Sequence, residues 1–134
     1  MTPILQPVVK SILVCQEVLR DNRGNLHLLG VFERIRRSHS GEPTPQYSYP
    51  QLCFVVAVTD VVGNFSARVR VTSASTDAVV FSSSTETVSI HDKLNVKWVV
   101  FRLRNCPLPV AGVNFFQLHW NGHVLAEFRI PVVD

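Results

Sequence analysis

Charged side chains are scarce in this chain of 134 residues. Aspartate, glutamate, lysine and arginine make up 17% of the sequence, and hydrophobic residues make up 46%. Soluble domains contain about 25% charged residues on average. The low charge favours a protein whose central strands are covered on both faces, or one that hides surface in an oligomer. The net charge of +3 is compatible with an anionic partner but does not require one.

Long hydrophobic runs are also missing. No apolar stretch approaches the roughly 18 residues that span a membrane, so we expect no membrane partner. The first residues, Met1–Pro7, have neither the basic region nor the long apolar region of a signal peptide, and a cytoplasmic location is therefore expected. The length predicts one domain, residues 1–134, which needs neither a metal nor a disulfide to hold its core together.

Cysteine occurs only three times, as Cys15, Cys53 and Cys106. An odd number with this spacing fits no metal-ligand pattern. Cys15 and Cys53 lie within apolar runs, where a free cysteine packs as a small hydrophobic residue. We expect reduced cysteines in the core of a cytoplasmic protein; a Cys15–Cys53 disulfide in an exported protein is the alternative.

Catalytic motifs are absent as well. The chain has no Gly-x-Ser-x-Gly elbow, no His-Glu-x-x-His, no phosphate-binding glycine-rich loop and no Cys-x-x-Cys pair. These absences favour a protein that is not an enzyme and uses no cofactor. A hydrolase or metal site assembled from distant strands stays an alternative.

Short runs of Val, Leu, Ile and Phe are what the chain does contain, and turn residues interrupt them every ten or so positions. The clearest interruptions are Asp21–Asn25, Asp60–Asn64 and Asn121-Gly122. This spacing is typical of all-β proteins and predicts an antiparallel β-sandwich with an immunoglobulin-like layout and about eight or nine strands. The expected strands are residues 8–19, 26–35, 52–59, 65–72, 78–81, 87–90, 93–103, 113–120 and 124–132.

Two of these segments carry distinct burial patterns. Leu52–Thr59 is apolar at nearly every position and is expected in the middle of a sheet. Phe65–Thr72 alternates apolar and polar residues and is expected to be half exposed. The loop at residues 36–51 contains three prolines and is the longest irregular segment that we expect. The expected core comprises Leu13, Cys15, Phe32, Phe54, Val56, Val69, Val71, Val99, Phe101, Phe116, Leu118 and Phe128.

The last hairpin permits a prediction of register. Asn121-Gly122 suggests a two-residue type I′ turn, but that register mixes apolar and polar residues on both faces. A three-residue connection, Trp120–Gly122, pairs Leu118 with Val124 and separates the faces. We therefore predict a type I turn with a bulge and Gly122 at positive φ. The face opposite Phe116 and Phe128 then collects Gln117, His119, His123 and Glu127.

Two groups of side chains are candidates for binding. Arg34, Arg36, Arg37 and His39 form a basic cluster, with Tyr47 and Tyr49 across the following loop. Arginines beside aromatic rings can grip phosphates and stack on bases, although a basic sheet edge also deters aggregation. His119 and His123 are cross-strand neighbours in the predicted register and could hold a metal with Glu127; two polar residues at a solvated hairpin tip are the simpler interpretation.

Several stretches of the sequence resemble a known family. They are Ile12–Cys15, Arg20-Asp21, Leu28–Phe32, Pro50, Thr59-Asp60 with Gly63, and Phe116 to Glu127. This pattern resembles a bacterial family of small proteins known only as a domain of unknown function. The resemblance covers most of the chain and implies a compact antiparallel β-sandwich. It brings no catalytic residue, substrate or cofactor.

Three functions remain as hypotheses. The first is a non-enzymatic protein-binding or assembly module, with a protein partner or self-association. The second is binding of an anionic ligand, nucleic acid or polysaccharide, at the Arg34–Arg37 region, nucleic acid being the less favoured partner. The third is an unrecognised hydrolase or metal site.

Overall fold

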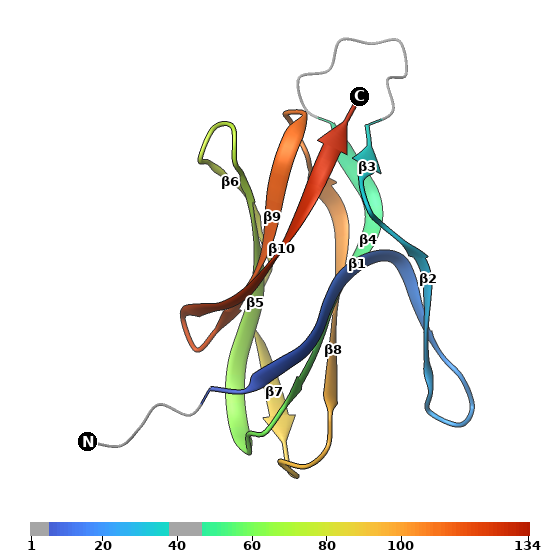
Figure 1. Ribbon diagram of the computed structural model, residues 1–134, viewed down its shortest axis with the longest axis vertical. Helices are drawn as coiled ribbons and strands as arrows, with labels where there is room; N and C mark the ends of the chain where they lie inside the picture. The colour runs from blue at the N-terminus through green and yellow to red at the C-terminus, as the bar shows by residue number, and fades with distance from the viewer. Residues whose placement is uncertain (1–5, 38–46) are drawn as a thin grey trace.

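The structure is a computed structural model, and it describes residues 6–37 and 47–134. Ten strands form within these residues (Figure 1). No helix among them is long and apolar enough to cross a membrane. The strands are β1 (Val8–Arg20), β2 (Leu26–Val31), β3 (Ile35–Arg36), β4 (Ser48–Thr59), β5 (Gly63–Ser73), β6 (Val79–Ser82), β7 (Glu86–Ile90), β8 (Lys97–Pro107), β9 (Gly112–Trp120) and β10 (His123–Val133).

The strands form two sheets, one of which curls as a half-barrel. Sheet A has the order β2-β1-β4-β8, and all its pairs are antiparallel. Its strand β4 lies between two neighbours and is buried at every position from Leu52 to Val58. The continuous apolar run in the sequence is therefore correctly interpreted as a central strand.

Sheet B contains β3-β10-β9-β5-β6 in that order, and β7 also pairs with β5. Residues 65–72 of β5 alternate as predicted, because Val69 and Val71 are buried while Arg68 and Arg70 lie on the other face. Strand β3 pairs in parallel with β10, through Ile35 opposite Val132. The sheets are thus not wholly antiparallel.

The prediction of eight or nine strands was wrong because residues 26–35 form two strands and not one. The chain leaves β2 at Val31 in sheet A and re-enters pairing at Ile35 in sheet B. Ile35 is fully buried, and its side chain belongs to the main core. The alternation of apolar and polar residues does not show where the chain passes from one sheet to the other. The sequence pattern therefore merges the two strands into one.

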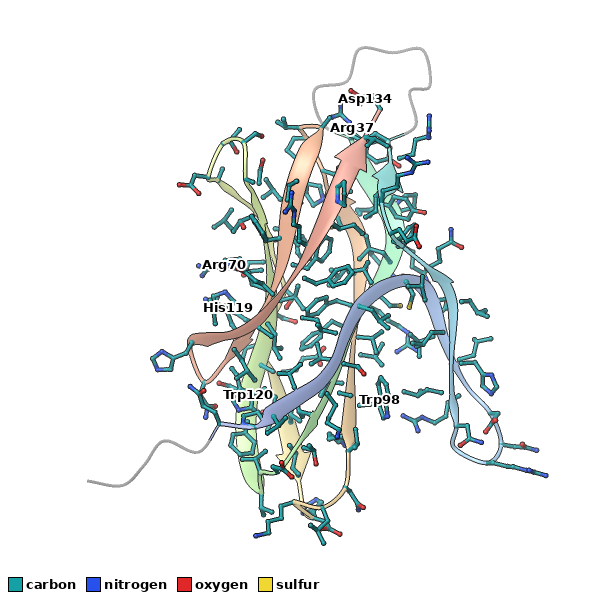
Figure 2. The ribbon with its side chains drawn as sticks, viewed as in Figure 1. Arg37, Arg70, Trp98, His119, Trp120 and Asp134 are labelled. Atoms are coloured by element: carbon teal, nitrogen blue, oxygen red, sulfur yellow. The ribbon has the colours of Figure 1, made fainter. Side chains whose placement is uncertain are left out.

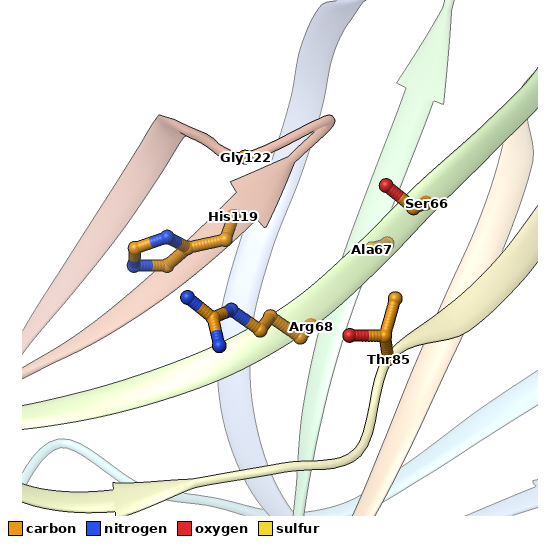
Figure 3. A pocket seen from close by; sticks show the side chains of 6 residues that line it. All are labelled: Ser66, Ala67, Arg68, Thr85, His119 and Gly122. Atoms are coloured by element: carbon orange, nitrogen blue, oxygen red, sulfur yellow. The ribbon is translucent and has the colours of Figure 1, made fainter.

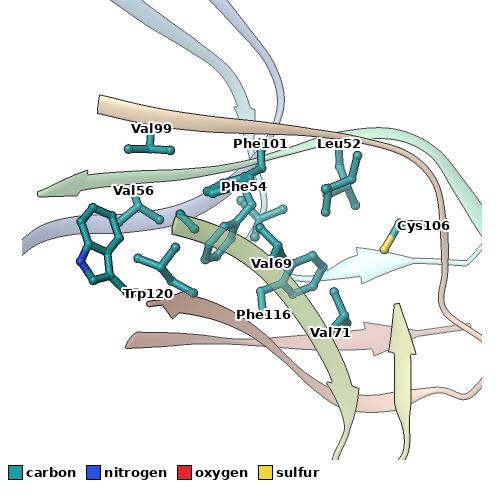
Figure 4. Packing of buried hydrophobic residues seen from close by; sticks show 14 of the residues in the cluster. Leu52, Phe54, Val56, Val69, Val71, Val99, Phe101, Cys106, Phe116 and Trp120 are labelled. Atoms are coloured by element: carbon teal, nitrogen blue, oxygen red, sulfur yellow. The ribbon is translucent and has the colours of Figure 1, made fainter. Parts of the chain in front are cut away.

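The main core lies between the two sheets (Figure 4). The ring of Phe54 on β4 is stacked against that of Phe116 on β9, with centroids 6.1 Å apart, and tilts against Phe101 on β8 at the same distance. These contacts join sheet A to sheet B. Nine of the predicted core residues are buried: Cys15, Phe54, Val56, Val69, Val71, Val99, Phe101, Phe116 and Leu118; Leu13, Phe32 and Phe128 are half-buried and pack against buried clusters.

A second apolar cluster lies on the outer face of sheet A. Cys15, Val18, Cys53 and Val55 are buried there, and Leu13, Leu26, Leu28 and Val100 pack against them. The side chains of β4 alternate, so residues between those of the main core face this cluster. The β1–β2 hairpin projects to one side in Figure 1 and contributes Leu26 and Leu28 to the cluster.

All three cysteines are buried and free, and Cys15 lies directly opposite Cys53 in the β1–β4 register. Burial raises the pKa of the Cys15 thiol to about 11 and that of the Cys106 thiol to about 12. The thiolate is the form that reacts with disulfide reagents. The folded protein is thus expected to keep these thiols largely protonated at neutral pH.

We predict that a chromogenic disulfide reagent at neutral pH reacts with none of the three thiols of the native protein on the timescale of seconds. In denaturant all three should react at once, because unfolding exposes them and restores an ordinary thiol pKa. The measurement is thiol titration with and without denaturant. Rapid labelling of Cys106 in the native protein would contradict the prediction.

The last hairpin corrects one prediction and confirms another. Its loop has two residues, because Trp120 pairs with His123, and both Asn121 and Gly122 have positive φ. This is the type I′ geometry, so the three-residue connection was wrong. The positive φ of Gly122, +83°, is as predicted.

Instead, a β-bulge on β10 places apolar and polar side chains on opposite faces of the hairpin. The register shifts between Val124 and Ala126, so that Leu118 pairs with Ala126 and Phe116 with Phe128. The extra residue places apolar side chains on the core face beyond it, as a β-bulge does. The predicted segregation is therefore correct for Phe116, Leu118 and Phe128, and its cause lies in the strand and not in the turn.

Candidate functional site

The basic cluster of residues 34–37 lies where β3 meets the end of β10. Arg34 and Arg36 are exposed, and the Arg36 Nη1 is 3.5 Å from the backbone oxygen of Asp134. The side chain of Arg37 is only 13% exposed and lies beside Asp134 at one end of the molecule (Figure 2). His39 lies outside the described residues, as does most of the predicted loop.

Arg37 is held by the protein itself. Its Nε donates to Asp134 Oδ1 at 2.7 Å, and its Nη2 forms an ion pair with the same oxygen. Its Nη1 donates to the carbonyl oxygens of Pro109 at 2.7 Å and Leu108 at 3.4 Å. All three nitrogens are engaged, so Arg37 connects β3 and the β8–β9 loop to the end of β10.

The two tyrosines of the cluster pack against the core. Tyr49 meets Phe32 edge-on, with ring centroids 5.4 Å apart. The backbone oxygen of Tyr47 accepts a hydrogen bond from the Leu108 amide at 2.8 Å. Both rings are half-buried against the main core. Their faces are therefore partly occupied, which reduces the surface that a base or sugar ring could stack on.

His119 and His123 are not cross-strand neighbours, contrary to the predicted register. The two-residue turn places Val124 opposite His119, and His123 opposite Trp120. His119 is 6% exposed, whereas His123 is exposed. In the described part of the chain no three His, Cys, Asp or Glu side chains come together where they could hold a metal ion. The pairing that motivated a metal site is therefore lost.

His119 belongs instead to a polar row across sheet B. Its Nε2 lies 3.3 Å from Gln117 Oε1, and Gln117 Nε2 donates to Glu127 Oε2 at 3.2 Å. An ionised carboxylate only accepts, so the Gln117 amide must present its oxygen to His119. The proton of neutral His119 is thereby assigned to Nε2. On the neighbouring strand Arg68 lies opposite His119, and the two line a small pocket (Figure 3).

A series of hollows lies along the free edge of sheet A. Strand β8 pairs only with β4 among the described strands, so its other edge, 11 residues long, has no hydrogen-bonded strand partner. A cavity of about 420 Å³ lies between β8 and β7, and two of about 200 and 250 Å³ lie beyond its ends. Shared lining residues, Glu86 on one side and His91 with Lys97 on the other, join the three into one groove. We call it the β8 groove.

Both apolar and basic side chains border the β8 groove. Trp98 is 36% exposed at this edge, whereas Trp120 is buried against Phe65. Arg102 and Arg104 follow on the same strand and are exposed. Arg102 Nη2 also donates to the Val18 carbonyl at 3.1 Å. The strand pattern of β8 was visible in the sequence, but its position at a sheet edge was not.

Comparison with known proteins places the chain in a family. The model of a family of unknown function, DUF6941, matches residues 10–133. The chain belongs to this family. The predicted resemblance to a family of unknown function is thus confirmed, and it covers nearly the whole chain. The family itself has no assigned activity, and no curated protein matches the sequence.

Solved structures show likeness in fold alone. A β-glucosidase from Listeria innocua in complex with glucose has a TM-score of 0.50 and 13% identity, and 92% of the family member is covered. A mutant of that enzyme in complex with laminaribiose has a TM-score of 0.51 and 12% identity, with 96% covered. The chain spans only 16% of the length of either enzyme. At this identity the likeness concerns the arrangement of strands and not glucosidase activity.

Proposed function

We propose that this protein is a non-enzymatic binding module that takes an extended segment of a protein partner along the β8 groove. The observation that carries the proposal is the open edge of β8, which is 11 residues long and lies beside connected cavities. An open edge offers a row of backbone donors and acceptors that an added strand can pair with. Cytoplasmic location and an immunoglobulin-like layout remain part of this proposal.

The chemistry of the edge defines the partner. On the outer face of sheet A, β8 presents Trp98 and Val100, followed by Arg102 and Arg104. Side chains of an added strand alternate, and those on this face lie beside these four. Apolar residues favour contact with Trp98 and Val100, and an acidic residue favours contact with Arg104, because Arg102 is already paired with Glu17 and Val18. The expected partner is an extended segment that combines apolar and acidic side chains.

Self-association through this edge is less favoured than a different partner. Arg102 is the central residue of β8. If two copies of β8 pair antiparallel along their full length, the Arg102 side chains of the two copies lie opposite one another. Like charges directly opposite one another destabilise a strand pair, and basic residues are a common protection of sheet edges. Light scattering at high concentration tests this point, and a monomer is the expected result.

The proposal is tested by selecting peptides from a random display library on the immobilised full chain. Enriched peptides should combine apolar and acidic residues, and their binding should protect β8 amides from hydrogen exchange. Trp98→Asp should weaken binding about tenfold or more, because a partly exposed aromatic residue at an interface is a typical hot spot. The readouts are titration calorimetry and exchange measured by mass spectrometry.

Val124→Asp is the matched control. Val124 is an exposed apolar residue, 50% accessible, and lies on β10 of the other sheet. This substitution should leave peptide affinity unchanged. Failure to enrich any peptide, or equal loss of binding in both variants, contradicts the proposal.

The anionic-ligand alternative at residues 34–37 has weaker support. Every nitrogen of Arg37 already has a partner within the protein, which leaves Arg34 and Arg36 as the exposed cations of that cluster. Salt-dependent retention on heparin that is lost in the Arg34→Ala plus Arg36→Ala variant would favour it.

A further inference from the structure

The outer face of sheet B carries two arginines that the cluster at residues 34–37 does not include. Arg68 and Arg70 point outward from β5, where Arg68 lies opposite His119 and Arg70 opposite Gln117 on β9. Directly opposed side chains have Cβ atoms about 5 Å apart, so these groups are near neighbours. Figure 2 shows Arg70 and His119 on the same side of the molecule.

Within residues 6–37 and 47–134 no ion pair of Arg68 or Arg70 is found. The Nε of Arg70 is buried and has no hydrogen-bond partner in the described part of the chain. A buried polar atom without a partner carries a desolvation cost, which is larger when the group is charged. Arg70 does not line the adjacent pocket, so its contribution there is its charge and not a direct hydrogen bond.

A pocket of about 180 Å³ opens beside these groups (Figure 3). Arg68 and His119 line it, together with Thr85 from the β6–β7 connection and Gly122 from the hairpin turn. In Figure 3 the Arg68 side chain extends from β5 toward His119, and Thr85 lies on the other side of Arg68. The lining thus combines a guanidinium, a hydroxyl and an imidazole, all of which can donate hydrogen bonds.

We propose that this pocket, which we name the Arg68 pocket, binds a single tetrahedral oxyanion of the sulfate or phosphate type. The guanidinium of Arg68 would bind it directly, and the charge of Arg70 would attract it from the adjacent position. A volume of about 180 Å³ accommodates one such group but not a polymer. The ligand differs from the protein partner of the β8 groove, so the two proposals can fail independently.

Proton uptake by His119 accompanies the binding. The charged groups that face His119 are Arg68 and Arg70 from β5 and, through Gln117, Glu127 from β10; Glu86 follows Thr85 on the β6–β7 side. Burial lowers the pKa of His119, and the charges of Arg70 and Arg68 lower it further. An anion between these groups opposes the repulsion and favours the cationic imidazole. Since Nε2 already holds a proton, the incoming proton goes to Nδ1.

Sulfate is the probe, because it is a dianion throughout the pH range in which histidine titrates. The His119 pKa is measured by NMR of the ring protons in chloride and in sulfate at equal ionic strength. We expect sulfate to raise this pKa. If the pKa rises by about 1, sulfate binding becomes about tenfold weaker on going from a pH below the His119 pKa of the free protein to a pH above that of the complex. Binding weakens in this direction because sulfate favours protonated His119, which is lost as pH rises.

Two variants and one control make the test specific. Arg68→Gln should abolish saturable sulfate binding, and His119→Gln should retain binding but remove its pH dependence. Arg129→Gln is the control, because Arg129 lies on the same face of β10 opposite Phe115 and outside the pocket. An unchanged His119 pKa in sulfate, or equal loss of binding in the Arg129 and Arg68 variants, overturns the proposal.

The source of the oxyanion is distinguished by a second titration. Inorganic phosphate is compared with a phosphate monoester, such as a nucleoside monophosphate, at one pH. Comparable affinity identifies a free oxyanion as the ligand, and tighter binding of the ester identifies a phosphorylated metabolite. Absence of saturable binding for both, with the chain shown to be folded, overturns the proposal.

Discussion

Phe116→Ala is expected to destabilise the protein by about 3–5 kcal/mol. Phe116 is fully buried, and its ring is stacked on Phe54 across the two sheets. Truncation removes the ring from the only core layer in which three phenylalanines meet among the described residues, and it leaves a cavity that the rigid strands cannot close. The total stability of a domain is about 5–15 kcal/mol, so the loss is a large fraction of it.

Urea denaturation followed by tryptophan fluorescence measures the effect. Phe115→Ala is a matched control, because Phe115 is the preceding residue, has the same side chain and lies half-exposed on the opposite face of β9. We expect a loss of about 1 kcal/mol for this control. If Phe116→Ala prevents folding altogether, Phe116→Leu keeps most of the volume and should still destabilise more than the Phe115 variant. Equal effects at the two positions would show that the assigned face of β9 is wrong.

Arg37→Ala is expected to lower the free energy of unfolding by about 1.5–3 kcal/mol, the range for hydrogen bonds of a charged group. Most of this arises from the bonds that Arg37 donates to the carbonyl oxygens of Pro109 and Leu108, because its side chain is largely buried. The contribution of Asp134 is smaller, since that carboxylate is 52% exposed and water screens the ion pair.

Arg34→Ala is the control for this experiment, because Arg34 belongs to the same cluster but is exposed. Its removal should change stability by less than about 0.5 kcal/mol. Both variants are compared by urea denaturation. A loss of heparin or nucleic-acid binding in the Arg37 variant, without a loss of stability, would contradict the structural role and favour the ligand role.

The two proposed sites share one connecting segment. Thr85 lines the Arg68 pocket, while Ser84 and Glu86, on either side of it, line the β8 groove. Adjacent residues of one short connection would therefore face two different ligands. An anion held by Thr85 would restrict this connection, and the stiffness of one wall of the groove would change with it.

The sequence by itself determined the all-β class and most of the strands. Alternation identifies β5 as half exposed, and the continuous run of Leu52 to Val58 identifies β4 as central, because side chains of a strand point to opposite faces in turn. The grouping of Phe116 and Leu118 on one face of β9 follows from the same period. These properties depend on local spacing, which the sequence contains.

Tertiary structure decided what local spacing does not contain. Three features depend on contacts between distant segments. They are the change of sheet between β2 and β3, the bulge at Leu125 and the hydrogen bond of Arg37 to Asp134. The same holds for the two candidate sites. The open edge of β8 results from the strand order, and Arg68 meets His119 because β5 pairs with β9 across about fifty residues of chain. Pairing between remote strands is therefore what brings the residues of each candidate site together.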